Sequence, residues 1–116
     1  MTQATHPNVV KVVDALAAAG ATGEVRTLPD EARTAAIAAE QLGVEVGAIA
    51  NSLVFDADGE PLLVLTSGAH RVDTARVAAL VGVGALRRAS PEFVREATGQ
   101  PIGGVAPVGH PAPLRT

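Results

Sequence analysis

The sequence contains no cysteine, tryptophan or tyrosine, and only two phenylalanines among its 116 residues. The absence of cysteine excludes disulfides, thiolate metal ligands and a cysteine nucleophile, and it agrees with a reducing compartment such as the cytoplasm. With so few aromatic side chains, stacking is not how this protein holds nucleic-acid bases. The core must be built from Ala, Val, Leu and Ile, which supply most of the 47% hydrophobic content.

Positive charge and long apolar runs are also scarce. Nine basic residues against twelve acidic ones give a formal net charge of −3. Broad nucleic-acid-binding surfaces neutralise phosphates with Lys and Arg, so we expect no DNA binding and only a small, local contact with any nucleic acid. No apolar stretch is long enough to cross a bilayer, and Lys11 and Asp14 interrupt the segment where a signal peptide would be apolar. We therefore expect no membrane partner and a cytoplasmic protein.

Apolar residues at helical spacing, with polar caps before them and glycines after them, predict four helices. These are 9–17, between the candidate caps Thr5 and Asn8 and the stop at Gly20; 34–42, opened by Thr34 and stopped by Gly43; 73–81, capped by Asp73 and stopped by Gly82; and 91–97, capped by Ser90 and stopped by Gly99.

Runs rich in Val and Leu predict a β-hairpin in the middle of a sheet, with strands from Ile49 to Phe55 and from Pro61 to Thr66 around a turn at 56–59. A shorter strand is expected over 24–28, ending at Pro29, and a loop containing Gly84 follows the third helix. Helices interleaved with a central hairpin favour a mixed-sheet α/β or α+β fold, organised as a single domain over residues 1–116.

The most specific string is GGVAPVGHP, residues 103–111, which we call the Gly/Pro loop. Gly103, Gly104 and Gly109 allow the backbone to approach a ligand and to direct N–H groups at an anionic or carbonyl oxygen. Pro107 fixes the backbone between them. Glycines and a proline are equally compatible with a purely structural loop.

A second candidate segment, TSGAHRVD, follows the hairpin at residues 66–73. Its small and polar residues, among them Ser67, Gly68 and Arg71, stand at a strand end, where such groups often form the floor of a site. The alternative is a strand-to-helix junction in which Asp73 caps the helix and pairs with Arg71.

Taken in order, TAAIAAEQLG, NSLVF, the hairpin, TSGAHRVD and GGVAPVGHP resemble the YbaK family of aminoacyl-tRNA editing domains, over residues 34–111. Its members include the editing insertion of bacterial prolyl-tRNA synthetase and free-standing proteins that hydrolyse mischarged tRNA, notably cysteinyl or alanyl esters on proline tRNA. The resemblance implies a mixed sheet flanked by helices, and the function of a trans-editing aminoacyl-tRNA deacylase.

The resemblance also implies a pocket between the sheet and the Gly/Pro loop that binds the 3′ aminoacyl-adenosine of tRNA, without a cofactor or a protein nucleophile. N–H groups around Gly104 and Gly109 would polarise the ester carbonyl while water or a ribose hydroxyl attacks. The sequence shows no Gly-x-Ser-x-Gly motif, which agrees with the lack of a serine nucleophile. The substrate-binding candidates are Ser52, Ser67, Gly68, Arg71, Gly103 and Pro107.

One histidine stands in the Gly/Pro loop. Histidine exchanges protons readily near neutral pH, so His110 is a candidate to contact the substrate or to move a proton. The other two, His6 and His70, are dispersed and lack acidic residues at metal-ligand spacing, and we predict no metal.

Asn51 differs from the family pattern. Members commonly have lysine followed by serine or threonine at the start of this strand, and that lysine is important for handling the substrate. Asparagine keeps hydrogen-bonding capacity but has no positive charge. The chain is therefore either a deacylase, with Asn51, Gly104, Gly109 and His110 as catalytic candidates, or a non-catalytic aminoacyl-tRNA-binding module of the same fold. A structural or interaction protein is the third alternative.

The length also differs from the family pattern, since members continue beyond the Gly/Pro loop with a further strand and helix. The sequence given stops at Thr116. We expect a fold truncated at its C-terminal side, and a possible homodimer that would cover an exposed sheet edge.

Overall fold

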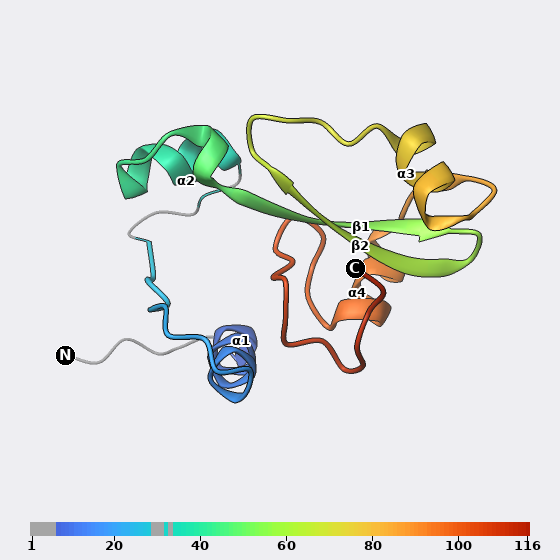
Figure 1. The fold of residues 1–116 in the computed structure, drawn as a ribbon. Coiled ribbons are helices and arrows are strands. Elements are labelled where there is room, and N and C mark those ends of the chain that lie inside the picture. The colour runs from blue at the N-terminus through green and yellow to red at the C-terminus, as the bar shows by residue number, and fades with distance from the viewer. Residues whose placement is uncertain (1–6, 29–31, 33) are drawn as a thin grey trace.

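The structure is a computed structural model that describes residues 7–28, 32 and 34–116. Within that range a β-hairpin carries helices on both of its faces (Figure 1). The elements are α1 (Pro7–Ala18), α2 (Ala35–Leu42), the 3-10 helix η1 (Val46–Ala48), β1 (Ala50–Ala57), β2 (Glu60–Ser67), α3 (Thr74–Val81), β3 (Leu86–Arg88) and α4 (Pro91–Thr98). The predicted mixed α/β class is confirmed.

Strands β1 and β2 form an antiparallel hairpin that is paired along its whole length, from Ala50 opposite Ser67 to Ala57 opposite Glu60. Its turn is Asp58-Gly59, with φ of 52° and 92°. Positive φ at both turn residues matches the twist of a hairpin, and aspartate followed by glycine adopts it most readily. The sequence had placed this turn correctly but made it two residues too long.

The hairpin lies at one side of the sheet, and our expectation of a central hairpin was wrong. The strand order is β2-β1-β3, with β3 antiparallel to β1 at residues 55–57 only. On the outer side of β2, Leu62 forms a single parallel bridge with Arg115, and the Leu63 N–H donates to the Arg115 carbonyl at 2.9 Å. The sequence missed β3 because three residues are too few to show a strand's alternation.

The expected strand over 24–28 was also wrong. This segment runs without regular structure, and Val25 is 41% exposed. A strand is held by hydrogen bonds to a neighbouring strand, and none of the described strands lies beside this segment. Pro29, Thr5 and His6 lie outside the described residues. Asn8 lies inside α1, so it does not cap that helix from outside.

The three later helices begin at the predicted caps and end at the predicted glycines. The cap side chains accept backbone hydrogen bonds: Thr34 from Ile37 at 3.2 Å, Asp73 from Arg76 at 3.1 Å and Ser90 from Phe93 at 3.1 Å. The left-handed end residues are Gly43, Gly82 and Gly99. Local sequence is sufficient here because each cap satisfies N–H groups of its own first turn.

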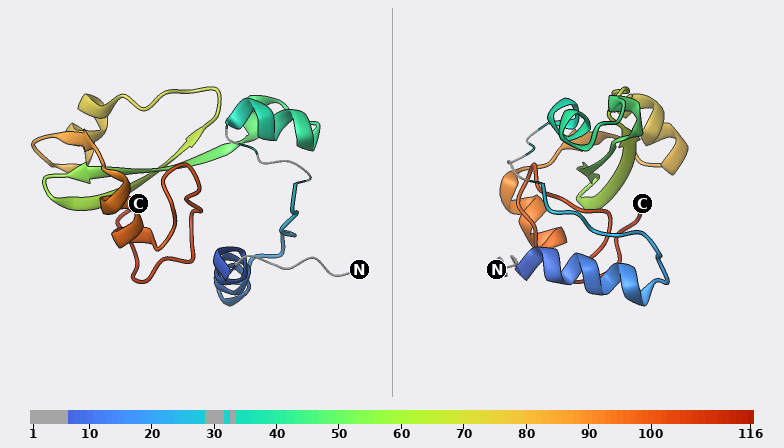
Figure 2. Two further views of the ribbon diagram at one scale, coloured as in Figure 1. Left: turned by 180° about the vertical axis from the view of Figure 1, so that it is seen from behind. Right: turned by 90° about the vertical axis from the view of Figure 1, so that its left-hand side faces the viewer.

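Helices α3 and α4 lie on opposite faces of the sheet (Figures 1 and 2). On the α3 face, Ala57, Leu62 and Leu86 pack with Ala78. Side chains alternate along a strand, so the neighbouring Leu63 points to the α4 face, where it is 1% exposed. Two small aliphatic cores therefore share one sheet.

A buried amide holds the Gly/Pro loop in place. Gln100 is 2% exposed; its Oε1 accepts from the Ala106 N–H at 2.7 Å, and its Nε2 donates to the Val108 carbonyl at 3.3 Å. Thr98, at the end of α4, accepts from the Gln100 N–H at 3.0 Å and donates to the Val94 carbonyl at 2.7 Å. The loop's shape is thus fixed from the end of α4.

Helix α1 contacts the other end of this loop. Gly109 has φ of 87°, and a Cβ on it would lie 3.3 Å from the Val12 backbone nitrogen. Only glycine combines this conformation with so close an approach. Helix α1 has no buried residue, and Val10 and Val13 are 44% and 41% exposed, so its apolar side is only partly covered.

Leu63→Ala should lower the free energy of unfolding by about 2–4 kcal/mol, because it leaves a cavity in the core under α4. Urea unfolding followed by circular dichroism measures the change. Leu80→Ala is the matched control: Leu80 is 78% exposed, so its truncation should change stability by less than about 0.5 kcal/mol. Equal effects of the two variants would contradict the described core.

Gln100→Ala should cost about 1–3 kcal/mol of stability, because it leaves a part-buried N–H of Ala106 and a part-buried carbonyl of Val108 without their partner. Limited proteolysis should then cut within 101–109 faster than in the parent protein. Glu96→Ala, an exposed change on α4, serves as control for both measurements. If the Gln100→Ala protein were as stable and as resistant to proteolysis as the control, Gln100 would not hold the Gly/Pro loop in place.

Candidate functional site

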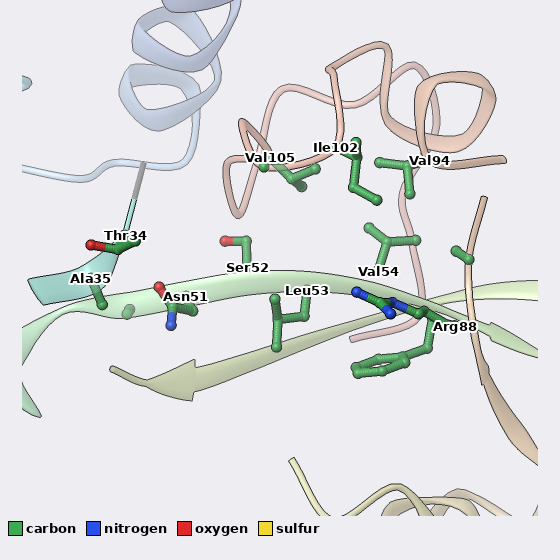
Figure 3. Close-up of a pocket in the computed structure, with 14 residues that line it drawn as sticks. Thr34, Ala35, Asn51, Ser52, Leu53, Val54, Arg88, Val94, Ile102 and Val105 are labelled. Atoms are coloured by element: carbon green, nitrogen blue, oxygen red, sulfur yellow. The ribbon is translucent and has the colours of Figure 1, made fainter. Parts of the chain in front are cut away.

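A cavity of about 640 Å³ lies between β1 and the beginning of the Gly/Pro loop (Figure 3). This volume is within the range of small-molecule sites. The cavity is lined by Thr34 and Ala35 at the start of α2, by β1 from Ala50 to Phe55, by Arg88, Ala89 and Val94, and by Ile102, Gly103 and Val105.

One edge of β1 is unpaired beside this cavity. β3 reaches back only to Phe55, so no described strand pairs with the earlier part of β1 on that side. The Gly68 N–H donates to the Ile49 carbonyl at 2.7 Å, which fixes the alternation of the β1–β2 ladder. The main-chain groups of Asn51 then face β2, and those of Ser52 face the open edge. The Ser52 N–H is therefore placed to bind a ligand.

Asn51 and Ser52 bring free side-chain groups to the two faces of β1 beside this cavity. Both are half-buried, and neither side chain has a hydrogen bond to another described residue. Successive strand residues point to opposite sides, and Figure 3 shows the Ser52 side chain on the side of β1 that faces Val105 while Asn51 lies near Ala35. The hydroxyl of Thr34, in contrast, is occupied as the helix cap.

The remaining wall of the cavity is apolar and carries one charge. Val54, Val94, Ile102 and Val105 form the apolar part. Among the described residues that line the cavity, Arg88 is the charged one and none is a carboxylate. The cavity is thus suited to a ligand with a small apolar group and a negative group, in a protein whose net charge is −3.

The structure distributes the candidates of the Gly/Pro loop over different surroundings. Gly103 lines the cavity with φ of 81°, a conformation that favours glycine. The Gly104 N–H donates to the Pro101 carbonyl at 2.9 Å, so it is already engaged inside the loop. Pro107 is exposed and does not line this cavity.

Gly109 and His110 line a second hollow, of about 450 Å³, on the side of α1. Lys11 and Asp14 lie on its opposite wall. The His110 Nε2 is 2.8 Å from the Ala106 carbonyl, to which it donates when that nitrogen carries the proton. Asn51 and His110 therefore do not face the same cavity in this structure.

Ser67 and Gly68 tie the end of β2 to the preceding helices. The Ser67 hydroxyl donates to the Gly47 carbonyl at 2.8 Å and accepts from the Ala69 N–H at 3.2 Å. A Cβ on Gly68 would lie only 2.7 Å from the Ala35 Cβ, so no side chain fits there. Arg71 is exposed, and none of the three lines the main cavity. Their assignment to substrate binding stays a prediction.

Sequence reasoning missed Arg88 and Gln100. Arg88 belongs to the short strand that was expected to be a loop, and nothing local distinguishes it from an ordinary exposed arginine. Gln100 stands between Gly99 and Pro101, where a solvent-facing residue is the usual expectation.

Comparisons with known proteins agree on one family. The aminoacyl-tRNA editing domain matches residues 29–116. The proline–tRNA ligase of Oleidesulfovibrio alaskensis is 40% identical over 70 residues, which are 60% of this chain and 12% of the ligase. The proline–tRNA ligase of Thermosipho melanesiensis is 36% identical over 77 residues, 66% of this chain and 14% of the ligase. The chain thus spans only a small part of these relatives.

A crystal structure of a candidate trans-editing enzyme for prolyl tRNA synthetase superposes with a TM-score of 0.87 and 46% sequence identity. The match covers 96% of this chain and 71% of that one. Among the described helices of this chain, none is both long and apolar enough to span a membrane. The family match, the identity and the shared fold together show that the chain belongs to the aminoacyl-tRNA editing domain family.

Proposed function

We propose that the chain is a trans-editing deacylase, which hydrolyses the ester of a mischarged tRNA of the cysteinyl or alanyl proline-tRNA class. The observation that carries the proposal is the cavity beside β1. It combines free hydrogen-bonding groups at Asn51 and Ser52 with a small apolar wall, in a chain of the editing family. The 3′ aminoacyl-adenosine of tRNA has the matching chemistry.

In the proposed reaction the ester carbonyl lies at the open edge of β1. The Ser52 N–H and the Asn51 amide donate to the carbonyl oxygen and stabilise the negative charge that develops there. Water attacks the carbonyl carbon, and the neighbouring hydroxyl of the terminal ribose orients this water. The bond between the carbonyl carbon and the ribose oxygen breaks, and that oxygen takes up the proton that the attacking water loses, which releases the free amino acid.

The remaining catalytic candidates act through the shape of the loop in this proposal. The Gly104 N–H closes the turn onto Pro101, and Gly109 allows α1 to approach. His110 holds the Ala106 carbonyl and so contributes to the same loop. Gly103 and the neighbouring Ile102 then present the cavity wall to the substrate.

Specificity would follow from the apolar wall. Val54, Val94 and Val105 leave room for a small side chain such as that of alanine or cysteine, while larger side chains would collide with them. A wall of this kind discriminates by size and gives roughly 10- to 200-fold per methylene group. The partner is the 3′ end of aminoacyl-tRNA, and the reaction belongs to the cytoplasm, where tRNA is charged.

The second candidate function is binding without turnover. It is favoured by Asn51, which brings no positive charge to the place where the family commonly has lysine. Such a module would hold the aminoacyl end of tRNA in the same cavity and protect or deliver it.

A deacylation assay distinguishes the two functions. We expect the chain to release amino acid from alanyl- or cysteinyl-tRNA(Pro), and to leave prolyl-tRNA(Pro), the matched control substrate, intact. Folded protein that binds these tRNAs but hydrolyses none of them would sink the enzymatic proposal and support the binding module. Failure to bind any aminoacyl-tRNA would exclude both.

Asn51→Ala should lower kcat/KM for the best substrate by about 10²-fold, the loss typical of one removed donor at a developing oxyanion. Thr66→Val is the matched control, because Thr66 lies directly opposite Asn51 on β2 and does not line the cavity. Single-turnover deacylation measures both variants. Activity that is unchanged in Asn51→Ala, or lost equally in the control, would contradict the assigned role.

A further inference from the structure

We infer that Arg88 binds the phosphate on the 5′ side of the terminal adenosine, and thereby orients the substrate along β1. The inference rests on the proposed function and adds to it a part of the substrate and a residue that holds it.

The charge of the cavity is the first observation. Fourteen residues of the described part of the chain line the cavity, and Arg88 is the charged one among these fourteen. The chain as a whole is acidic, with twelve acidic residues against nine basic ones. An anion therefore finds attraction at Arg88 that the rest of the acidic chain does not generally offer.

The freedom of the Arg88 guanidinium is the second observation. Of the two other arginines attached to this sheet, Arg115 donates to the Val81 carbonyl at 2.7 Å. Arg87 stands opposite Asp56 in the register and does not line the cavity. Arg88 stands opposite Phe55 and makes no hydrogen bond or ion pair within the described part of the chain. Its five N–H donors are available to a ligand.

The direction of the side chain is the third observation. In Figure 3 the guanidinium of Arg88 reaches back along β1 toward Val54, over the edge that β3 leaves open. Its register partner Phe55 is four residues from Asn51, which corresponds to roughly 13 Å along a strand. The reach of the side chain shortens that separation, so one nucleotide can contact both ends.

These positions fix the orientation of the ligand. The ester is attached on the 3′ side of the ribose and the phosphate on its 5′ side. An adenosine laid along β1 with its ester at Asn51 and Ser52 extends its phosphate toward Arg88. A guanidinium fork matches two phosphate oxygens at once, which an asparagine cannot do. The arginine would thus supply, from β3, a cation that Asn51 does not supply from β1.

Binding of two stable substrate analogues tests this assignment. The probes are 3′-alanylamino-3′-deoxyadenosine, whose amide resists hydrolysis, and the same compound with a 5′-phosphate. Isothermal titration should show the parent protein binding the phosphorylated probe roughly fivefold to tenfold more tightly, as expected for a partly exposed charge-assisted pair. The preference should shrink as salt is raised.

Arg88→Gln should abolish this preference while leaving the affinity for the unphosphorylated probe unchanged. Arg88→Lys should keep part of it, because it retains the charge and loses the fork. Arg87→Gln is the matched control on the same strand, and it should keep the full preference since Arg87 does not line the cavity.

The outcomes separate the two proposals. Equal binding of both probes to the parent protein, or a preference that survives in Arg88→Gln, overturns the role of Arg88 and leaves the proposed function standing. Loss of the preference in Arg87→Gln as well would show a general effect of charge and would also overturn it. Failure of the parent protein to bind either probe overturns the proposed function, and this inference with it.

Discussion

The unequal pairing of β1 on its two edges is the constraint on which the site depends. Toward β2 the strand is paired over all eight residues, whereas toward β3 it is paired over three. The full ladder holds β1 rigid. The short one leaves main-chain groups at Ser52 open to a ligand while the rest of the strand stays in the sheet. The unpaired N–H groups of a strand that is held in a sheet keep their direction before a ligand binds. Hydrogen-bond donors fixed in this way stabilise a developing negative charge most effectively.

The Gly/Pro loop can form one wall of the cavity because buried side chains at the end of α4 fix its conformation. Thr98 and Gln100 are buried polar residues, and their hydrogen bonds go to the backbone of the same segment. A buried amide without hydrogen-bond partners would lower the stability of the fold. The loop backbone therefore stabilises the buried Gln100 amide, and the amide stabilises the loop. The loop's glycines then serve packing as much as chemistry: Gly109 admits α1, and Gly103 lies at the cavity.

The described lining of the cavity is positively charged, whereas the chain as a whole is negatively charged. The chain carries a net negative charge, yet the lining residues that the structure describes include one cation, Arg88, and no carboxylate. In the proposed binding mode, Asn51 would supply hydrogen bonding beside the ester and Arg88 positive charge for the phosphate, two properties that a lysine at position 51 would combine. This division would give a physical reason for an editing domain with Asn51 to keep its substrate.

The sequence by itself determined the features that depend on neighbouring residues. The caps Thr34, Asp73 and Ser90 satisfy N–H groups of their own helices, and Asp58-Gly59 supplies its own turn, so each could be predicted locally. The resemblance carried by the Gly/Pro loop and NSLVF was likewise sufficient for the family. It also pointed to a cavity beside β1, because that geometry accompanies the motifs.

Only the tertiary structure decided which groups share the cavity. The expected strand over 24–28 has no partner among the described strands, whereas β3 is a strand because it pairs with the edge of β1. Neither outcome can be predicted from the residues of the segment itself. The separation of Asn51 from His110, the engagement of the Gly104 N–H and the placement of Arg88 and Gln100 all involve residues that fold together from different elements. Local patterns report periodicity and turn chemistry, whereas a site is a set of long-range contacts, and those are fixed by how the strands pair and the loop packs.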